Sequence, residues 1–466
     1  MFKVLQQIMF RVSAVLLLGS LVIPTTASAA LDVDLSEAEL RNLVERSYQY
    51  VAMYNVNNKF AMKQGGWNIC NEDTQLKDHT MREIARPNND TLYISCLIDL
   101  RAEPVILEMP DFDSNYVSLM ITGYDHYVNV PMSSGLGDFD EAQTMLLFSK
   151  RTDDYEGQPV PGVERLFEAS GDFISAVLRI MPHSNDAERF DRIKRQMKDV
   201  RLVTLSEFNG AQPRTATDPE FPAVGQTDVD VFADNLLEVM QFVFNHTNFG
   251  ADDPLDLALL DMYEPLGNAP GRTFDPEKVA ALDGEQLRKV ALAVQRGEFS
   301  RAMDPATMKH AGEFMFQPKG DIPLDVLVMQ SVTGPIGLPR QEAMYFPVVE
   351  ADGQTLNAQH DYVIHMDADS MPPAGPFWSM TLYDSENGFF IPNDRKKYSV
   401  GENAGMQLNA DGGIDVYVSA EAPEGVPAEN WLPINRKDEN IDIILRVYVP
   451  DLEEVKSWSP PSAERL

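Results

Sequence analysis

Short apolar runs of strand length occur in two blocks of this chain, and this arrangement restricts its fold more than any other feature. In the first block the runs cover residues 92–96, 105–109, 116–120 and 145–148, and Pro, Asp, Gly and Asn turns separate them. In the second block they cover residues 343–349, 362–366, 377–383, 414–418 and 441–448. Strands of this length and spacing are typical of β-sandwiches and barrels.

A helical stretch separates the two blocks. Residues 186–198 and 229–245 carry apolar side chains at helical spacing, and Asp253-Pro254 is a typical helix start. Before the first block, Ser36 followed by Glu37 and Glu39 predicts the cap of a leading amphipathic helix. The predicted fold class is therefore mainly β with helical insertions, with two all-β domains bridged by helices. The predicted organisation is a signal peptide over 1–29, an N-terminal β-sandwich domain with a leading helix over 30–180, a helical linker region over 181–315 and a C-terminal β-sandwich domain over 316–466.

The first 29 residues have the pattern of a secretory signal peptide. Lys3 and Arg11 are followed by an apolar run over residues 12–23, and small residues precede the expected cleavage after Ala29. We expect a periplasmic or secreted protein, and a retained N-terminal anchor is the alternative. No later segment is long and apolar enough for a membrane span, which needs roughly 20 apolar residues.

The charge balance excludes several partners. The chain has 38 Lys and Arg residues against 72 Asp and Glu residues, a formal net charge of −34. A chain this acidic repels nucleic acid and anionic membrane surfaces. A small molecule is therefore the expected partner.

The chain has two cysteines, Cys70 and Cys96. In an exported protein they could form a disulfide, and the alternative is two separate small apolar side chains. Two cysteines cannot build a zinc site by themselves.

Familiar catalytic motifs are absent. The sequence has no GxSxG, GxxxxGK, HExxH or GxGxxG pattern, and we predict no cofactor. Residues 360–369 contain two histidines and three aspartates, but no spacing of a known closed metal site. We expect a solvated strand edge there, and no metal.

Polar residues gather just before one strand. Residues 86–93 include Arg86, Asn89, Asp90 and Tyr93. Two interpretations account for this cluster. It is either a structural turn, in which Arg86 pairs with Asp90, or a functional loop beside a rigid strand. A similar segment follows at residues 123–129 and contains Tyr124.

The C-terminal half adds aromatic candidates and one unusual cation. Alternation along residues 377–383 places Trp378 on one face of a strand and Tyr383 on the other. These rings and Trp431 have either a core or a binding role. Arg446 lies within the apolar run 443–448, so a guanidinium that points inward there needs a carboxylate or a ligand anion.

A set of motifs in order along the chain resembles a known family. The chain resembles the bacterial proteins that pair the domain of unknown function 1254 with the domain of unknown function 1214, from about residue 40 to residue 450. The resemblance implies two jelly-roll-like β-sandwich domains joined by helices, and it implies no agreed activity. The motifs lie at residues 89–93, 124–129, 266–267, 270–271, 377–384, 409–412, 430–433 and 445–450.

Two functions follow from these residues. The first is an exported enzyme with hydrolytic or proton-transfer chemistry on a small, anionic organic molecule bound between the sandwiches. Asp90 and Tyr93 are then the acid/base candidates, Arg86 and Arg446 hold the anion, and Trp378 and Trp431 form an apolar wall. The second is a non-catalytic small-molecule-binding or envelope-assembly protein. Homo-oligomerisation fits either function. The full set of substrate-binding candidates is Arg86, Asn89, Tyr124, Trp378, Tyr383, Trp431 and Arg446.

Overall fold

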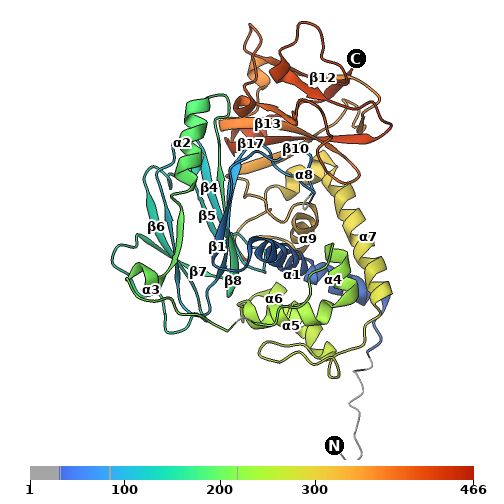
Figure 1. Cartoon of the computed structure of the whole chain (residues 1–466). Helices are drawn as coiled ribbons and strands as arrows, with labels where there is room; N and C mark the ends of the chain where they lie inside the picture. The colour runs from blue at the N-terminus through green and yellow to red at the C-terminus, as the bar shows by residue number, and fades with distance from the viewer. Residues whose placement is uncertain (1–30, 32, 83–84, 218) are drawn as a thin grey trace, which may run out of the picture.

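The computed structural model describes residues 31, 33–82, 85–217 and 219–466. The predicted signal peptide lies outside these residues. Two β-sandwiches pack against a group of helices, with the C-terminal sandwich at the top of Figure 1 and the N-terminal sandwich at the left. The prediction of two sheet-rich domains with helical insertions is confirmed.

The N-terminal sandwich has two sheets, with strand orders β1-β2-β8-β4-β5 and β7-β6-β3-β9. Leu92 and Ile94 of β2 and Leu178 of β8 face its core. Because side chains alternate along a strand, Tyr93 and Arg179 face the other way, out of the sandwich. The strands are β1 Ile69–Asp73, β2 Leu92–Asp99, β3 Val105–Met109, β4 Val117–Thr122, β5 Val130–Ser133, β6 Gln143–Ser149, β7 Arg165–Ala169, β8 Phe173–Ile180 and β9 Arg201–Thr204.

Two features of this sandwich bear on the sequence predictions. β9 pairs with β3, so the N-terminal sandwich continues past the predicted boundary at residue 180. Cys70 of β1 and Cys96 of β2 are directly opposed and form a disulfide. The disulfide ties the edge strand β1 to its neighbour.

The C-terminal sandwich also has two sheets, with strand orders β10-β17-β13-β14 and β16-β15-β12-β18. In the first of these, the short strand β11 also pairs with β17. Trp378, Met380 and Leu445 face its core, so Tyr383 and Arg446 face outward. The strands are β10 Ala343–Val348, β11 Leu356–Asn357, β12 Tyr362–Met366, β13 Ala374–Asp384, β14 Ser399–Gly401, β15 Ile414–Ser419, β16 Trp431–Pro433, β17 Asn440–Pro450 and β18 Ala463–Arg465.

The helices lie beside both sandwiches. α1 begins with the predicted cap at Ser36, where a capping box with Glu39 satisfies the first turn, and it ends at Gly65 in the left-handed conformation. It packs against α5, α7 and α9. The helices are α1 Glu37–Gln64, α2 Ala187–Met197, α3 Leu205–Phe208, α4 Asp228–Asp234, α5 Leu236–His246, α6 Pro254–Tyr263, α7 Gly284–Ala302, α8 Pro305–Ala311 and α9 Leu324–Thr333.

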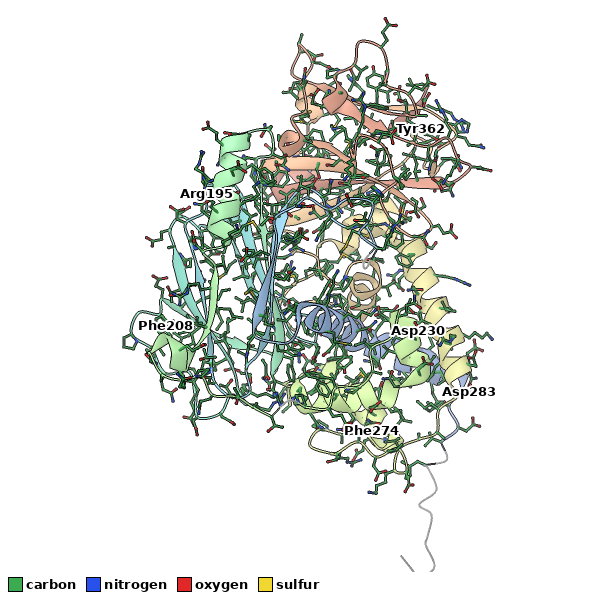
Figure 2. All side chains as sticks on the ribbon, in the orientation of Figure 1. Arg195, Phe208, Asp230, Phe274, Asp283 and Tyr362 are labelled. Atoms are coloured by element: carbon green, nitrogen blue, oxygen red, sulfur yellow. A yellow bond between two sulfur atoms is a disulfide. The ribbon has the colours of Figure 1, made fainter. Side chains whose placement is uncertain are left out.

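The two sandwiches meet at their outward faces. Tyr116 and Met120 of the N-terminal domain, Phe377 and Tyr448 of the C-terminal domain, and residues of α9 form one buried apolar cluster. Figure 2 shows side chains filling the space between the elements, with Tyr362 in the upper sandwich and Arg195 on α2. No helix among the described residues is long and apolar enough to cross a membrane.

Candidate functional site

A cavity of about 430 Å³ lies where the outward faces of the two sandwiches meet the helices. Its volume is within the range of small-molecule sites, about 300–1,000 Å³. Much of its wall is apolar and comes from the helices and their connections, including Phe60, Phe299, Met303, Met308 and Ile336. The polar part of the wall comes from the two sheets.

Arg179 is the cation of the N-terminal sheet at this cavity. It lies next to the C-terminal end of β8, the central strand of its sheet, and is only 3% exposed. Its Nη2 donates a hydrogen bond to the Ile336 carbonyl oxygen at 2.7 Å, and its Nε donates to the Tyr93 hydroxyl at 3.4 Å. Its Nη1 is buried and has no hydrogen-bond partner among the described residues. A buried donor without an acceptor is costly, so this atom marks a place for a ligand acceptor.

Arg446 is the corresponding cation of the C-terminal sheet. Its Nη1 donates to Thr381 Oγ1 at 2.9 Å, and its Nη2 donates to the Tyr383 hydroxyl at 2.8 Å. Burial alone would lower the pKa of this guanidinium, but the phenols of Tyr383 and Tyr448 and the carboxyl of Asp90 raise it above its usual value. Arg446 therefore stays charged at the cavity wall.

Arg86 adds a third cation at the wall, but it has an acidic partner. Its Nε donates to Asp442 Oδ2 at 3.1 Å, and its Nη2 contacts the same oxygen. The guanidinium also lies over the Phe299 ring. The predicted pair of Arg86 with Asp90 is therefore wrong, because Asp442 of β17 takes the guanidinium instead.

Asp90 is buried beside the cavity and does not line it. Ser379 donates to Asp90 Oδ2, and the Tyr448 hydroxyl donates to the same oxygen at 3.3 Å. Burial raises its pKa, against the opposing effect of Arg446. Asn88, which does line the cavity, donates to the Tyr448 hydroxyl at 2.6 Å. The Asp90 carboxyl is thus connected to the cavity wall through Tyr448 and then Asn88.

Tyr93 and Arg446 were also predicted site residues, and both line the cavity together with Arg86. Asn89 does not line it, and its Nδ2 donates to the Lys77 carbonyl oxygen at 3.2 Å. Tyr383 lies behind Arg446, and its hydroxyl donates to the Pro87 carbonyl oxygen at 2.7 Å.

Three predicted aromatic binders lie elsewhere. Tyr124 is in the core of the helical region and accepts a hydrogen bond from Asn58 at 3.1 Å. Trp378 faces the core of the C-terminal sandwich, because alternation turns it away from the interdomain face. The Trp431 indole donates to the Ser419 carbonyl oxygen at 2.9 Å within that same domain. The predicted Trp378–Trp431 wall is therefore wrong, and helix-borne Phe and Met side chains take its place.

Segment 360–369, which contains two histidines and three aspartates, contributes to a small acidic network on the surface. His365 Nδ1 contacts Asp415 at 2.6 Å and His365 Nε2 contacts Asp367 at 3.2 Å. These carboxylates raise the pKa of the histidine. Within the described part of the chain, no group of three or more His, Cys, Asp or Glu side chains could hold a metal ion.

Sequence reasoning missed Arg179 and Tyr345, which both line the cavity. The signal that selected Arg446, an arginine inside an apolar strand, is also present in the run Val177-Leu178-Arg179-Ile180. Tyr345 has no comparable signal, because a tyrosine on a sandwich strand is most often a core residue.

Comparisons with known proteins agree with this domain organisation. Protein of unknown function (DUF1254) matches residues 68–201, and Protein of unknown function (DUF1214) matches residues 342–452. No curated protein matches the chain.

Two solved structures match most of this chain. The VPA0106 protein from Vibrio parahaemolyticus is 24% identical, with a TM-score of 0.65 over 92% of this chain and 100% of that chain. A putative uncharacterized protein from Burkholderia cenocepacia is 13% identical, with a TM-score of 0.47 over 92% of this chain and 96% of that chain. The first likeness supports the fold alone. With both domains present in the expected order, the chain belongs to the proteins that pair DUF1254 with DUF1214.

Proposed function

We propose that this chain is an exported protein that binds a small anionic organic molecule in the cavity between its two β domains. The observation that carries the proposal is Arg179, a buried guanidinium at the cavity wall whose Nη1 has no partner among the described residues. An anionic oxygen is the acceptor that such a donor binds most strongly. The apolar remainder of the wall fits a ligand with a hydrocarbon or aromatic body.

The charge of the whole chain makes this local cluster more informative. The net charge is −34, so the surface as a whole does not attract anions. Arg86, Arg179 and Arg446 nevertheless all line one cavity. A protein with nearly twice as many acidic as basic residues has little general reason to place three arginines at one cavity, and anion binding supplies a specific one.

The test is a thermal-shift screen of the mature protein with a library of organic anions and their neutral analogues, with and without chelator. Anions are expected to raise the melting temperature by mass action. Arg179→Gln is expected to lose that shift. Arg41→Gln is the matched control, because Arg41 is an exposed residue of α1 paired only with Glu45, and it is expected to keep the shift. A response to neutral molecules alone, or no response, would contradict the proposal and favour the envelope-assembly function.

An enzymatic role is the second candidate, and the position of Tyr93 favours it. Its hydroxyl lies 3.4 Å from Arg179 Nε at the cavity wall. From this position the hydroxyl could give a proton to a bound molecule or take one from it. Asp90 could act only through Tyr448 or Asn88, which makes it a positioning residue.

Tyr93→Phe separates the two candidates. Once a ligand is found, an enzyme with Tyr93 as its acid or base would keep binding but lose turnover of that ligand, measured by mass spectrometry. If the wild-type protein binds ligands but converts none of them, only the binding function remains.

A further inference from the structure

The two sheets that face the cavity present equivalent rows of side chains. In the N-terminal sheet Arg179 lies between Tyr93 on one neighbouring strand and Ser118 on the other. In the C-terminal sheet Arg446 lies between Tyr345 and Ser379 in the same way. Each sheet thus carries a Tyr–Arg–Ser row with its arginine in the middle.

Both rows also have a buried acid three residues before the tyrosine. Asp90 precedes Tyr93, and Glu342 precedes Tyr345. Each acid bonds to the opposite domain: Ser379 donates to Asp90, and Ser133 donates to Glu342.

The electrostatic contacts cross between the domains as well. Asp90 interacts with Arg446, and Glu342 interacts with Arg179. The two domains therefore build one site from matching parts.

Both arginines act on the same part of the cavity. Burial raises the pKa of Tyr345, and Arg179 and Arg446 both oppose that effect, so both guanidiniums lie near this phenol, which lines the same cavity. Their acidic neighbours do not satisfy them by hydrogen bonds. Among the described residues, Arg179 donates hydrogen bonds to a carbonyl and a phenol, and Arg446 donates to two hydroxyls and the Arg86 carbonyl.

Burial also disfavours the ionised form of both acids. Burial raises the pKa of Asp90 and raises that of Glu342 to about 7. Each carboxyl accepts a hydrogen bond from a serine on the opposite domain, and among the described residues neither accepts one from Arg179 or Arg446. Two cations in a region of low dielectric are stabilised most by two ligand charges.

We propose that the cavity selects a dianion: an organic molecule with an apolar body and two negative charges, held jointly by Arg179 of the N-terminal sheet and Arg446 of the C-terminal sheet. This inference rests on the proposed anion-binding function. The two charges can lie on one phosphate group or on two carboxylates, because a guanidinium binds either in the same forked geometry.

Three probes with the same chain length test the charge requirement. Octanoate carries one charge, octyl phosphate carries two at one end, and octanedioate carries one at each end. Calorimetric titration at pH 8, where all three are fully ionised, is expected to give at least one dianion a dissociation constant ten or more times smaller than that of octanoate. Octyl phosphate and octanedioate then distinguish one doubly charged group from two separate groups.

Variants test the assignment to the two arginines. Arg179→Gln is expected to remove the preference for the dianion, whereas Arg41→Gln is expected to keep it. Far-ultraviolet circular dichroism and the melting temperature confirm that each variant is folded. Two results would overturn the dianion inference and leave the proposed function intact. One is equal affinity of the wild type for all three probes, and the other is a preference for the dianion that survives in Arg179→Gln. Absence of binding by all three would overturn both.

Discussion

Glu342 is a buried carboxyl at the junction of the two β domains, and Glu342→Gln tests what that burial does to stability. The residue is 1% exposed, Ser133 donates to its Oε1, and its Oε2 has no hydrogen-bond partner among the described residues. Burial raises the pKa from its ordinary value of 4.5 to about 7. The folded protein therefore favours the neutral acid.

The sign and size of the pH effect follow from linkage. Between pH 4.5 and pH 7 the folded state holds a proton on Glu342 that the unfolded state has lost, so the free energy of unfolding falls as the pH rises through this window. Above pH 7 the full cost of the buried charge is present, about 3 kcal/mol for this difference in pKa. Gln has nearly the same shape and no charge to bury. The variant is expected to lie within about 1 kcal/mol of the wild type at pH 5 and to exceed its stability by up to about 3 kcal/mol at pH 8.5.

Urea unfolding at half-unit steps from pH 5 to pH 8.5 measures this difference. Glu141→Gln, at an exposed position, is the control and is expected to give a flat difference across the range. A Glu342→Gln difference that stays constant with pH would refute the reasoning, because it would mean that Glu342 ionises in the folded protein as easily as in the unfolded chain.

Three further predictions use unfolding midpoints. Replacing Cys70 and Cys96 together by Ser is expected to cost roughly 3 kcal/mol of unfolding free energy, and reductant is expected to destabilise the wild type but not the variant. Burial lowers the pKa of His126 to about 4, so this residue is expected to reduce stability as the pH falls from 6.5 towards 4. His126→Asn, which suits the left-handed backbone there, is expected to weaken this pH dependence. The same loss of stability between pH 6.5 and pH 4 in the variant and the wild type would contradict the prediction. Asp90→Asn is expected to stay near wild-type stability. Asp90→Ala leaves two hydroxyls without their acceptor and is expected to cost about 1–3 kcal/mol of unfolding free energy. Equal losses of unfolding free energy in the two variants would argue against this hydrogen-bond role.

The sequence predicts this fold well where periodicity is strong. Alternation along β13 correctly separates Trp378, on the sandwich core, from Tyr383, on the interdomain face. The capping signal at Ser36 correctly starts α1. These predictions succeed because they depend on neighbours in sequence, for which strand and helix geometry fix the direction of each side chain.

The site is harder to predict because it depends on contacts between distant segments. Arg86 precedes Asp90 by four residues, yet its carboxylate partner is Asp442, 356 residues away. Asp90 is likewise bonded to Ser379 and Tyr448 of the other domain. The order of residues alone cannot show which outward face of one sandwich meets which face of the other.

The position of the two arginines within their sheets gives the strongest reason to assign them a function. β8 and β17 are both paired on two sides, so neither Arg179 nor Arg446 can reach solvent around a free sheet edge. Replacing a buried ion pair by apolar residues is often neutral or stabilising, so stability alone does not explain a guanidinium on an inner strand of each sheet. Arg446 satisfies several of its donors within the protein, whereas Arg179 leaves Nη1 without an acceptor. A ligand anion at the cavity satisfies that donor and explains why both domains place an arginine at the same point of the row.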